Sequence, residues 1–312
     1  MLLIGQELDR EHTGSKGRPF PQVALDMALE ACRSPLHLGM LAFERNEPWN
    51  VDEYKWIEGE GYHFKLWLPL DPHGRLPEMR YVVGADIGAG TSGDTSSNSV
   101  LEIFDAQTRE QVGELAVNTI PPTQFGELAV AVCYWLGRGA QTTFLAWEKN
   151  GPGGVAFTRE VMRLNYGNVL YEKQGSEMAN YSTTTNRPGY HTRDTYTTLE
   201  PLISSLFSSD IVIRSSLLIE ECGQYVFNDA GKVEHPKAKT TRDGSARGPS
   251  HGDRAIATAI AVRALAARPP RKVAATPEAA YGGDATEKYS FAWRMEQRKS
   301  RLKRSQLASC RW

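Results

Sequence analysis

Three carboxylate residues stand where regular elements are expected to begin or end. Asp86 closes the apolar run YVVGAD, Glu148 follows the apolar run TTFLAW, and Asp253 opens an alanine-rich segment. Strand ends meet at one edge of a sheet, and a helix packed there can add a third side chain. Clustered carboxylates repel one another unless they are protonated or bound to a divalent cation. The three acids therefore predict a site for Mg²⁺ or Mn²⁺, which prefer hard oxygen ligands.

Such a site is suited to phosphodiester hydrolysis. Two divalent ions about 3.5–4 Å apart can activate water and stabilise the leaving oxygen. We therefore expect Asp86, Glu148 and Asp253 to act both as metal ligands and as catalytic residues. The turn after Asp86, IGAGTSGDTSSNS, contains mostly small side chains, and we expect it to leave room for a substrate phosphate.

Each acid also has an explanation that involves no ligand. Asp86 stands two residues before a glycine and is typical of a turn former. Glu148 precedes Lys149 and fits a solvated strand end, whereas Asp253 follows Ser250 at the spacing of a helix capping box. These explanations are independent of one another. A metal site explains all three positions at once.

The elements that must position the acids follow from hydrophobic periodicity. Strand-like runs at 81–86, 99–105 and 110–117 predict an antiparallel meander. The next segment, 121–139, has helical spacing and ends at glycines. Its predicted buried face consists of Phe125, Leu128, Ala129, Val132 and Leu136.

The rest of the chain alternates between predicted strands and helices. The expected elements are a strand at 142–147, a helix at 154–165, a strand at 168–172, a helix at 198–208, strand-like segments at 211–213 and 217–227, a hairpin tip at NDAGK and a helix at 251–267. This order is typical of an α/β protein with a ribonuclease H-like mixed sheet flanked by helices, here with an added β-hairpin.

The first 80 residues predict a linker or remnant rather than an independent domain. They contain one amphipathic segment, 21–32, with Val23, Met27, Ala28 and Ala31 at helical spacing, and short strands within 56–70. No GxxxxGK[ST] motif occurs, so a Walker-type ATP site is absent from the sequence. We expect the nuclease domain to span 81–267.

Composition narrows the class further. The formal net charge is −1, but residues 268–312 contain eleven Lys/Arg and four Asp/Glu, an excess of seven positive charges that predicts a basic, flexible tail. The four cysteines are far apart and form no CxxC pair, which favours a reducing compartment. No apolar run approaches the about 20 residues that span a bilayer, and the N-terminus lacks a signal peptide. We expect a cytoplasmic protein without membrane partners.

Five segments, in order, resemble the nuclease domain of phage terminase large subunits, the enzymes of DNA packaging. They are GADIGAG with GDTSS, FLAWEKNGPG, GYHTRDTYTTLEPLISSL, LIEECGQYVFNDAGKVEH and SHGDRAIATAIA, and they cover about residues 81–267. The resemblance implies an endonuclease that cuts double-stranded DNA with Mg²⁺ or Mn²⁺, held by Asp86, Glu148 and Asp253. It also implies a host-cell cytoplasmic location if the chain is phage-encoded.

Two departures from the family pattern stand out. Gly252 occupies the position at which the family often has the first of two adjacent aspartates, which predicts a weaker or differently selective metal site. The family's N-terminal ATPase is absent, and residues 5–21 resemble the stretch that joins it to the nuclease. The resemblance therefore implies a separate packaging ATPase, together with a portal and a small terminase subunit, as partners.

Accessory residues are also predicted. His251 could orient a water or contact the phosphate, and Asp94 is a candidate second acid near the site. The loop 237–250 lies just before Asp253 and is expected to contact the DNA backbone. Its basic residues are Lys237, Lys239, Arg242 and Arg247.

Three other functions stay open. DIGAGTSGDTSSNSV also resembles the phosphate-binding hairpin of actin-like and sugar-kinase ATPases, although a second Asp-x-Gly segment of that type is missing. A ribonuclease H-like recombinase would share the metal site and cut a different DNA structure. An inactive packaging scaffold would bind DNA or portal without cleavage.

Overall fold

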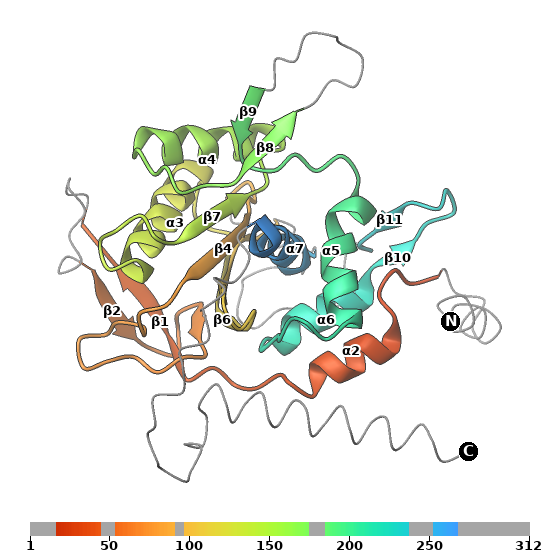
Figure 1. The fold of residues 1–312 in the computed structure, drawn as a ribbon, viewed down its shortest axis with the longest axis horizontal. Helices are drawn as coiled ribbons and strands as arrows, with labels where there is room; N and C mark the ends of the chain where they lie inside the picture. Colours follow the sequence, from red (N-terminus) through yellow and green to blue (C-terminus); the bar gives the residue numbers. More distant parts are fainter. Residues whose placement is uncertain (1–16, 45–53, 91–96, 175–184, 237–251, 268–312) are drawn as a thin grey trace, which may run out of the picture. The chain divides into compact units, whose positions relative to one another are not determined.

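The described residues contain a seven-stranded mixed sheet with helices packed against it (Figure 1). The computed structural model describes residues 17–44, 54–90, 97–174, 185–236 and 252–267. The strand order is β2-β1-β3-β6-β5-β4-β7. The predicted basic tail 268–312 and basic loop 237–250 lie outside the described residues.

The predicted meander is confirmed. Strands β4 (Tyr81–Asp86), β5 (Ser99–Asp105) and β6 (Gln111–Val117) pair antiparallel in chain order. Helix α3 (Pro122–Leu136) then crosses to β7 (Phe144–Trp147), which pairs parallel to β4. This arrangement, three antiparallel strands and a parallel strand returning beside the first, confirms the ribonuclease H-like α/β fold.

The first 80 residues contribute to the same sheet. Strands β1 (His37–Ala42), β2 (Lys55–Glu58) and β3 (Phe64–Leu66) are antiparallel, and β3 pairs with β6. Strands that precede residue 80 in the sequence and strands that follow it therefore belong to one hydrogen-bonded sheet. The sequence indicated the short strands near β2 and β3, but it did not indicate β1 or its place in the sheet.

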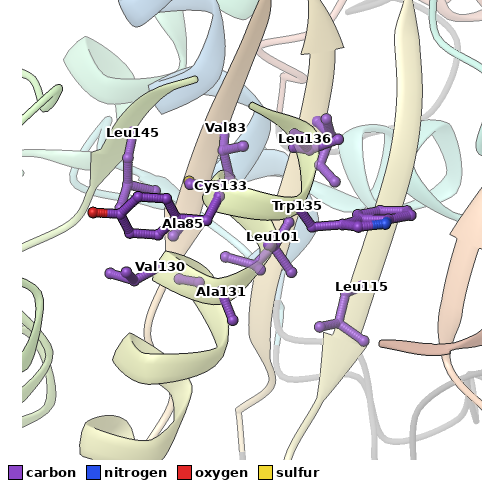
Figure 2. Packing of buried hydrophobic residues seen from close by; sticks show 14 of the residues in the cluster. Val83, Ala85, Leu101, Leu115, Val130, Ala131, Cys133, Trp135, Leu136 and Leu145 are labelled. Carbon is purple, nitrogen blue, oxygen red and sulfur yellow. The ribbon is translucent and has the colours of Figure 1, made fainter. Parts of the chain in front are cut away.

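One face of the sheet packs against α3. Figure 2 shows Val83, Ala85, Leu101 and Leu115 from the strands facing residues of this helix. The face of α3 that was predicted to be buried is buried or partly buried. Most of the opposite face of α3 is buried too, because α4 (Gly151–Arg163) packs against this helix. The indole of Trp135 also stacks on that of Trp56, with ring centroids 5.8 Å apart.

The other face packs against α7 (Asp253–Ala267), with α5 (Thr195–Phe207) and α6 (Ser216–Gln224) beside it. Gly84 permits this close packing. A β-carbon at residue 84 would lie 2.6 Å from the backbone nitrogen of Ala261. Only a residue without a side chain can lie this close to the helix backbone.

Two expectations from the sequence are wrong. Residues 217–227 were expected to be strand-like, but most of them form α6, whose Leu218, Ile219 and Cys222 are buried at helical spacing. The apolar run LLI misled the assignment, because short apolar runs suit a buried strand or a helix equally well. Segment 211–213 forms only an isolated bridge, between Val212 and Glu110.

The amphipathic pattern expected for 21–32 is wrong in part: Ala28 packs against the core, but Val23 and Met27 do not. Helix α2 (Gln22–Leu29) buries Ala24 and Leu25, whereas Val23 is 71% exposed and Met27 is 53% exposed. The helix packs against α6 and α5 and therefore turns a different side inward. Periodicity alone could not identify the side that those two helices cover.

Two short hairpins complete the described part of the chain. One pairs β8 (Tyr171–Gln174) with β9 (Thr185–Pro188), and the other pairs β10 (Val226–Phe227) with β11 (Val233–Glu234). The second has the predicted turn NDAGK at its tip. Among the described helices, none has both the length and the apolar character needed to cross a membrane.

Candidate metal centre

Asp86 and Glu148 lie side by side at the ends of two parallel strands. The pairing of β4 with β7 runs from Val82↔Phe144 to Ala85↔Trp147, and the Glu148 N–H donates to the Ala85 carbonyl oxygen over 3.0 Å. The next residues along the two strands are Asp86 and Glu148, which therefore adjoin. Besides burial, the charge and the side chain of Glu148 are among the causes that raise the pKa of Asp86.

Asp253 is the first residue of α7, the helix that packs on β4. Its carboxylate Oδ2 accepts the backbone N–H of Asn98 at 2.6 Å. Asn98 directly precedes β5, whose Val100 pairs with Asp86. Two of the predicted acids thus stand at adjoining strand ends, and the third begins α7, the helix packed on β4.

Burial and mutual repulsion act on these acids together. Burial, followed by the charges of Glu148 and Asp253, raises the pKa of Asp86 well above its usual range. Burial and the charge of Glu221 raise the pKa of Asp253 to about 7. Each shift disfavours the charged carboxylate, which is the electrostatic condition that a bound cation relieves.

The carboxylate oxygens of the three acids are suitable ligands for a divalent cation. The three side chains do not, however, form a complete coordination site. Within the described ranges, no three His, Cys, Asp or Glu side chains are grouped closely enough to hold one ion. Asp86 and Glu148 form an adjoining pair of hard oxygen donors, and Asp253 interacts with Asp86 through charge. This donor set suits Mg²⁺ or Mn²⁺ rather than a cation that prefers sulfur or nitrogen.

Lys149 does not neutralise Glu148. Its Nζ lies 2.8 Å from Glu172 Oε2, so the lysine beside Glu148 in sequence is paired elsewhere. Tyr190 forms an isolated parallel β-bridge with Glu148. The Asn150 side chain donates a hydrogen bond to the Thr192 carbonyl oxygen at 2.7 Å. Residues 189–192 therefore line the edge of the sheet beside Glu148.

The glycines after Asp86 have a structural role. A β-carbon on Gly88 would lie 2.9 Å from the Asn98 carbonyl carbon, and one on Gly90 would lie 2.8 Å from the Pro121 Cα. Gly90 also has a φ of 67°, which favours glycine. Packing against neighbouring backbone therefore explains both glycines without a phosphate. Asp94 lies outside the described residues.

Gly252 is similarly constrained. Its φ is 86°, and a β-carbon there would lie 2.7 Å from Tyr225 Cζ. The Tyr225 hydroxyl donates to the Gly252 carbonyl oxygen at 3.1 Å. The aromatic ring thus occupies the space that a side chain at residue 252 would need. His251, Lys237, Lys239, Arg242 and Arg247 lie outside the described residues.

Sequence reasoning missed three residues around the acids: Asn98, Glu221 and Tyr225. Asn98 carries no motif signal, because it contacts Asp253 through its backbone. Glu221 could have been found if α6 had been recognised. Ser215 caps that helix, and its apolar residues at i, i+1 and i+4 are a helical pattern.

The sheet order defines an α/β protein of ribonuclease H-like topology, with Asp86 and Glu148 at the adjoining ends of β4 and β7. No family model matches the chain, and no curated protein matches it by sequence.

The chain is similar in structure to nuclease domains of large terminases. One is the large terminase nuclease of thermophilic phage G20c with bound cobalt, at 13% identity and a TM-score of 0.46, covering 77% of this chain and 96% of that one. Another is the nuclease domain of the Thermus phage P74-26 large terminase, at 13% identity and a TM-score of 0.43, covering 76% and 93%. The human cytomegalovirus terminase nuclease domain has 13% identity and a TM-score of 0.35, covering 59% and 84%.

Proposed function

We propose that this chain is a divalent-metal-dependent endonuclease that cuts double-stranded DNA during phage genome packaging. One observation carries the proposal: Asp86 and Glu148 stand at adjoining ends of the parallel strands β4 and β7, and Asp253 is the first residue of the helix that packs on β4. Mutual repulsion between acids that are buried close together lowers the stability of the folded protein. Such an arrangement is therefore more typical of a functional site than of a structural one.

Each acid has a defined part in the proposed site. Asp86 and Glu148 would hold the metal as a pair of oxygen ligands from rigid strand ends. Asp253 would add its carboxylate from α7, with Oδ2 oriented by the Asn98 N–H at 2.6 Å. When bound, the divalent ions would supply an activated water and stabilise the leaving oxygen of the phosphodiester.

The resemblance to terminase large subunits supports double-stranded DNA as the substrate. It also leads us to propose a packaging ATPase, a portal and a small terminase subunit as partners. The basic residues of loop 237–250, and His251 two positions before Asp253, stay predictions for DNA contact.

Plasmid cleavage tests the proposal. We expect nicked and linear products with Mg²⁺ or Mn²⁺ and none in EDTA. Asp86→Asn and Glu148→Gln should each reduce cleavage at least 100-fold, as expected for metal ligands. The matched control is Glu30→Gln, which changes an exposed glutamate after α2. Intact plasmid with either metal, accompanied by ATP hydrolysis, would instead support the actin-like or kinase function.

A further inference from the structure

A buried charged pair lies directly behind Asp253. The Arg254 guanidinium is inaccessible to solvent, and the Glu221 side chain is only 3% exposed. Arg254 Nη1 donates to Glu221 Oε1 at 2.7 Å. Replacing a buried ion pair with apolar residues is often neutral or stabilising, so stability alone gives no strong reason for this pair.

Glu221 also caps α7 from a different helix. Its Oε2 accepts the backbone N–H of Arg254 at 2.9 Å and that of Ala255 at 3.4 Å. The first N–H groups of a helix have no partner within the helix, and a carboxylate there is favoured by the helix dipole. Gly252, which precedes the helix, has no side chain to act as a cap. Glu221 supplies that acceptor through tertiary structure.

The same arginine ties α7 to the sheet. Arg254 Nε lies 3.2 Å from Glu114 Oε1 on β6, and Lys65 Nζ on β3 lies 2.7 Å from the same oxygen. Burial alone would raise the pKa of Glu114, but the charges of Arg254 and Lys65 outweigh it and lower that pKa to about 2. The carboxylate is therefore charged. The first turn of α7 is held by α6 on one side and by β6 on the other.

We propose that Glu221 and Arg254 are positioning residues: they hold the first turn of α7, and with it Asp253, in place beside Asp86, so that both carboxylates can act on the same metal ion. Asp253 directly precedes Arg254, whose backbone N–H and side chain are both bound by Glu221. Asp253 Oδ2 is fixed in turn by the Asn98 N–H. The α7 terminus therefore has little freedom to shift along β4. This inference rests on the proposed metal-dependent function, and neither residue contacts DNA or metal in it.

Metal affinity of the full chain tests the proposal apart from catalysis. Mn²⁺ binding is measured by calorimetry for the wild-type chain, Glu221→Gln and Arg254→Lys. Glu221→Gln preserves the shape of the side chain but removes its charge. Arg254→Lys preserves the charge but cannot contact both Glu221 and Glu114 as the guanidinium does. Both should bind Mn²⁺ at least 10-fold more weakly. Arg254→Lys provides the test if Glu221→Gln does not fold.

Glu110→Gln is the matched control. Glu110 is a buried carboxylate whose Oε1 lies 2.6 Å from Arg214 Nη2, before β6 and at the opposite end of the strands from Asp86. It should lose stability in urea unfolding and bind Mn²⁺ like the wild type. Three outcomes would each overturn the proposal. They are Mn²⁺ affinity equal to the wild type in both site variants, an equal loss of Mn²⁺ affinity in the control, and no Mn²⁺ binding by the wild type. Mn²⁺ binding that depends on Glu221, without DNA cleavage, would overturn only the proposed nuclease function.

Discussion

Gly84 on β4 lies against the backbone of Ala261 on α7, so closely that a β-carbon at residue 84 would be 2.6 Å from the Ala261 nitrogen. Asp86 is two residues further along the same strand, on the same face. Asp253 is eight residues before Ala261, about two turns along the helix. The strand-to-helix contact at Gly84 therefore sets the distance between two of the three acids.

Gly84→Ala should displace α7 and destabilise the fold. Overpacking a filled contact of this kind costs about 1–3 kcal/mol, and here the obstructing atoms are backbone. Urea unfolding should show a lower midpoint, and Mn²⁺ affinity should fall with it. Gly61→Ala is the control, because a β-carbon there meets nothing within 4 Å. Unchanged stability of Gly84→Ala would contradict the close approach.

Gly252→Asp should not build a stronger metal site. The substitution adds a fourth carboxylate next to Asp253, but it needs a φ of 86° and the space that Tyr225 fills. We expect a loss of about 1–3 kcal/mol in unfolding free energy and no gain in Mn²⁺ affinity.

Gly231→Asp separates strain from steric overlap in that experiment. Gly231 also has a positive φ, 73°, but a β-carbon there meets nothing within 4 Å. It should be the milder substitution in thermal unfolding. Equal effects of the two substitutions would show that the Tyr225 ring does not restrict residue 252.

The metal-free protein should lose stability as pH rises. Burial and Glu221 raise the pKa of Asp253 to about 7, and burial with its acidic neighbours raises that of Asp86 well above its usual range. The folded state therefore binds more protons than the unfolded state above pH of about 4, the ordinary Asp pKa. The free energy of unfolding in EDTA should fall between that pH and about 7.

Asp86→Asn should reduce this fall. It removes a buried charge, so at pH 8 in EDTA the variant should be more stable than the wild type by about 1–3 kcal/mol. Saturating Mg²⁺ should reverse the order, because the cation stabilises only a site that binds it. Glu200→Gln, which changes an exposed carboxylate on α5, should leave the pH profile unchanged. A less stable Asp86→Asn at pH 8 in EDTA would refute the repulsion between the acids.

Two leucines of α2 test which side of that helix is buried. Leu25 is 4% exposed and belongs to the same buried cluster as Ala24, whereas Leu29 is 49% exposed. Leu25→Ala should cost about 2–4 kcal/mol in unfolding free energy, and Leu29→Ala should cost less than about 1 kcal/mol. Urea unfolding of both variants measures the difference. Equal losses would mean that the helix faces the body of the protein differently.

The sequence by itself determined the central elements and where Asp86, Glu148 and Asp253 fall on them, whereas their role as metal ligands stays a prediction. Strands β4 and β5 have the predicted bounds, and α3, β7 and α7 lie where periodicity placed them, because these elements are long or strongly apolar. Asp86, Glu148 and Asp253 could be chosen because strand ends and helix starts can be read locally.

Only the tertiary structure decided what surrounds those acids. The addition of β1–β3 to the sheet, the inward side of α2 and the caps on α7 depend on contacts between residues far apart in the chain. Glu221 lies 33 positions from Arg254, and Asn98 lies 155 positions from Asp253. Hydrogen bonds and close packing of this kind leave no periodic trace, because each partner is ordinary in its own segment and acquires its role only when folding brings the two together.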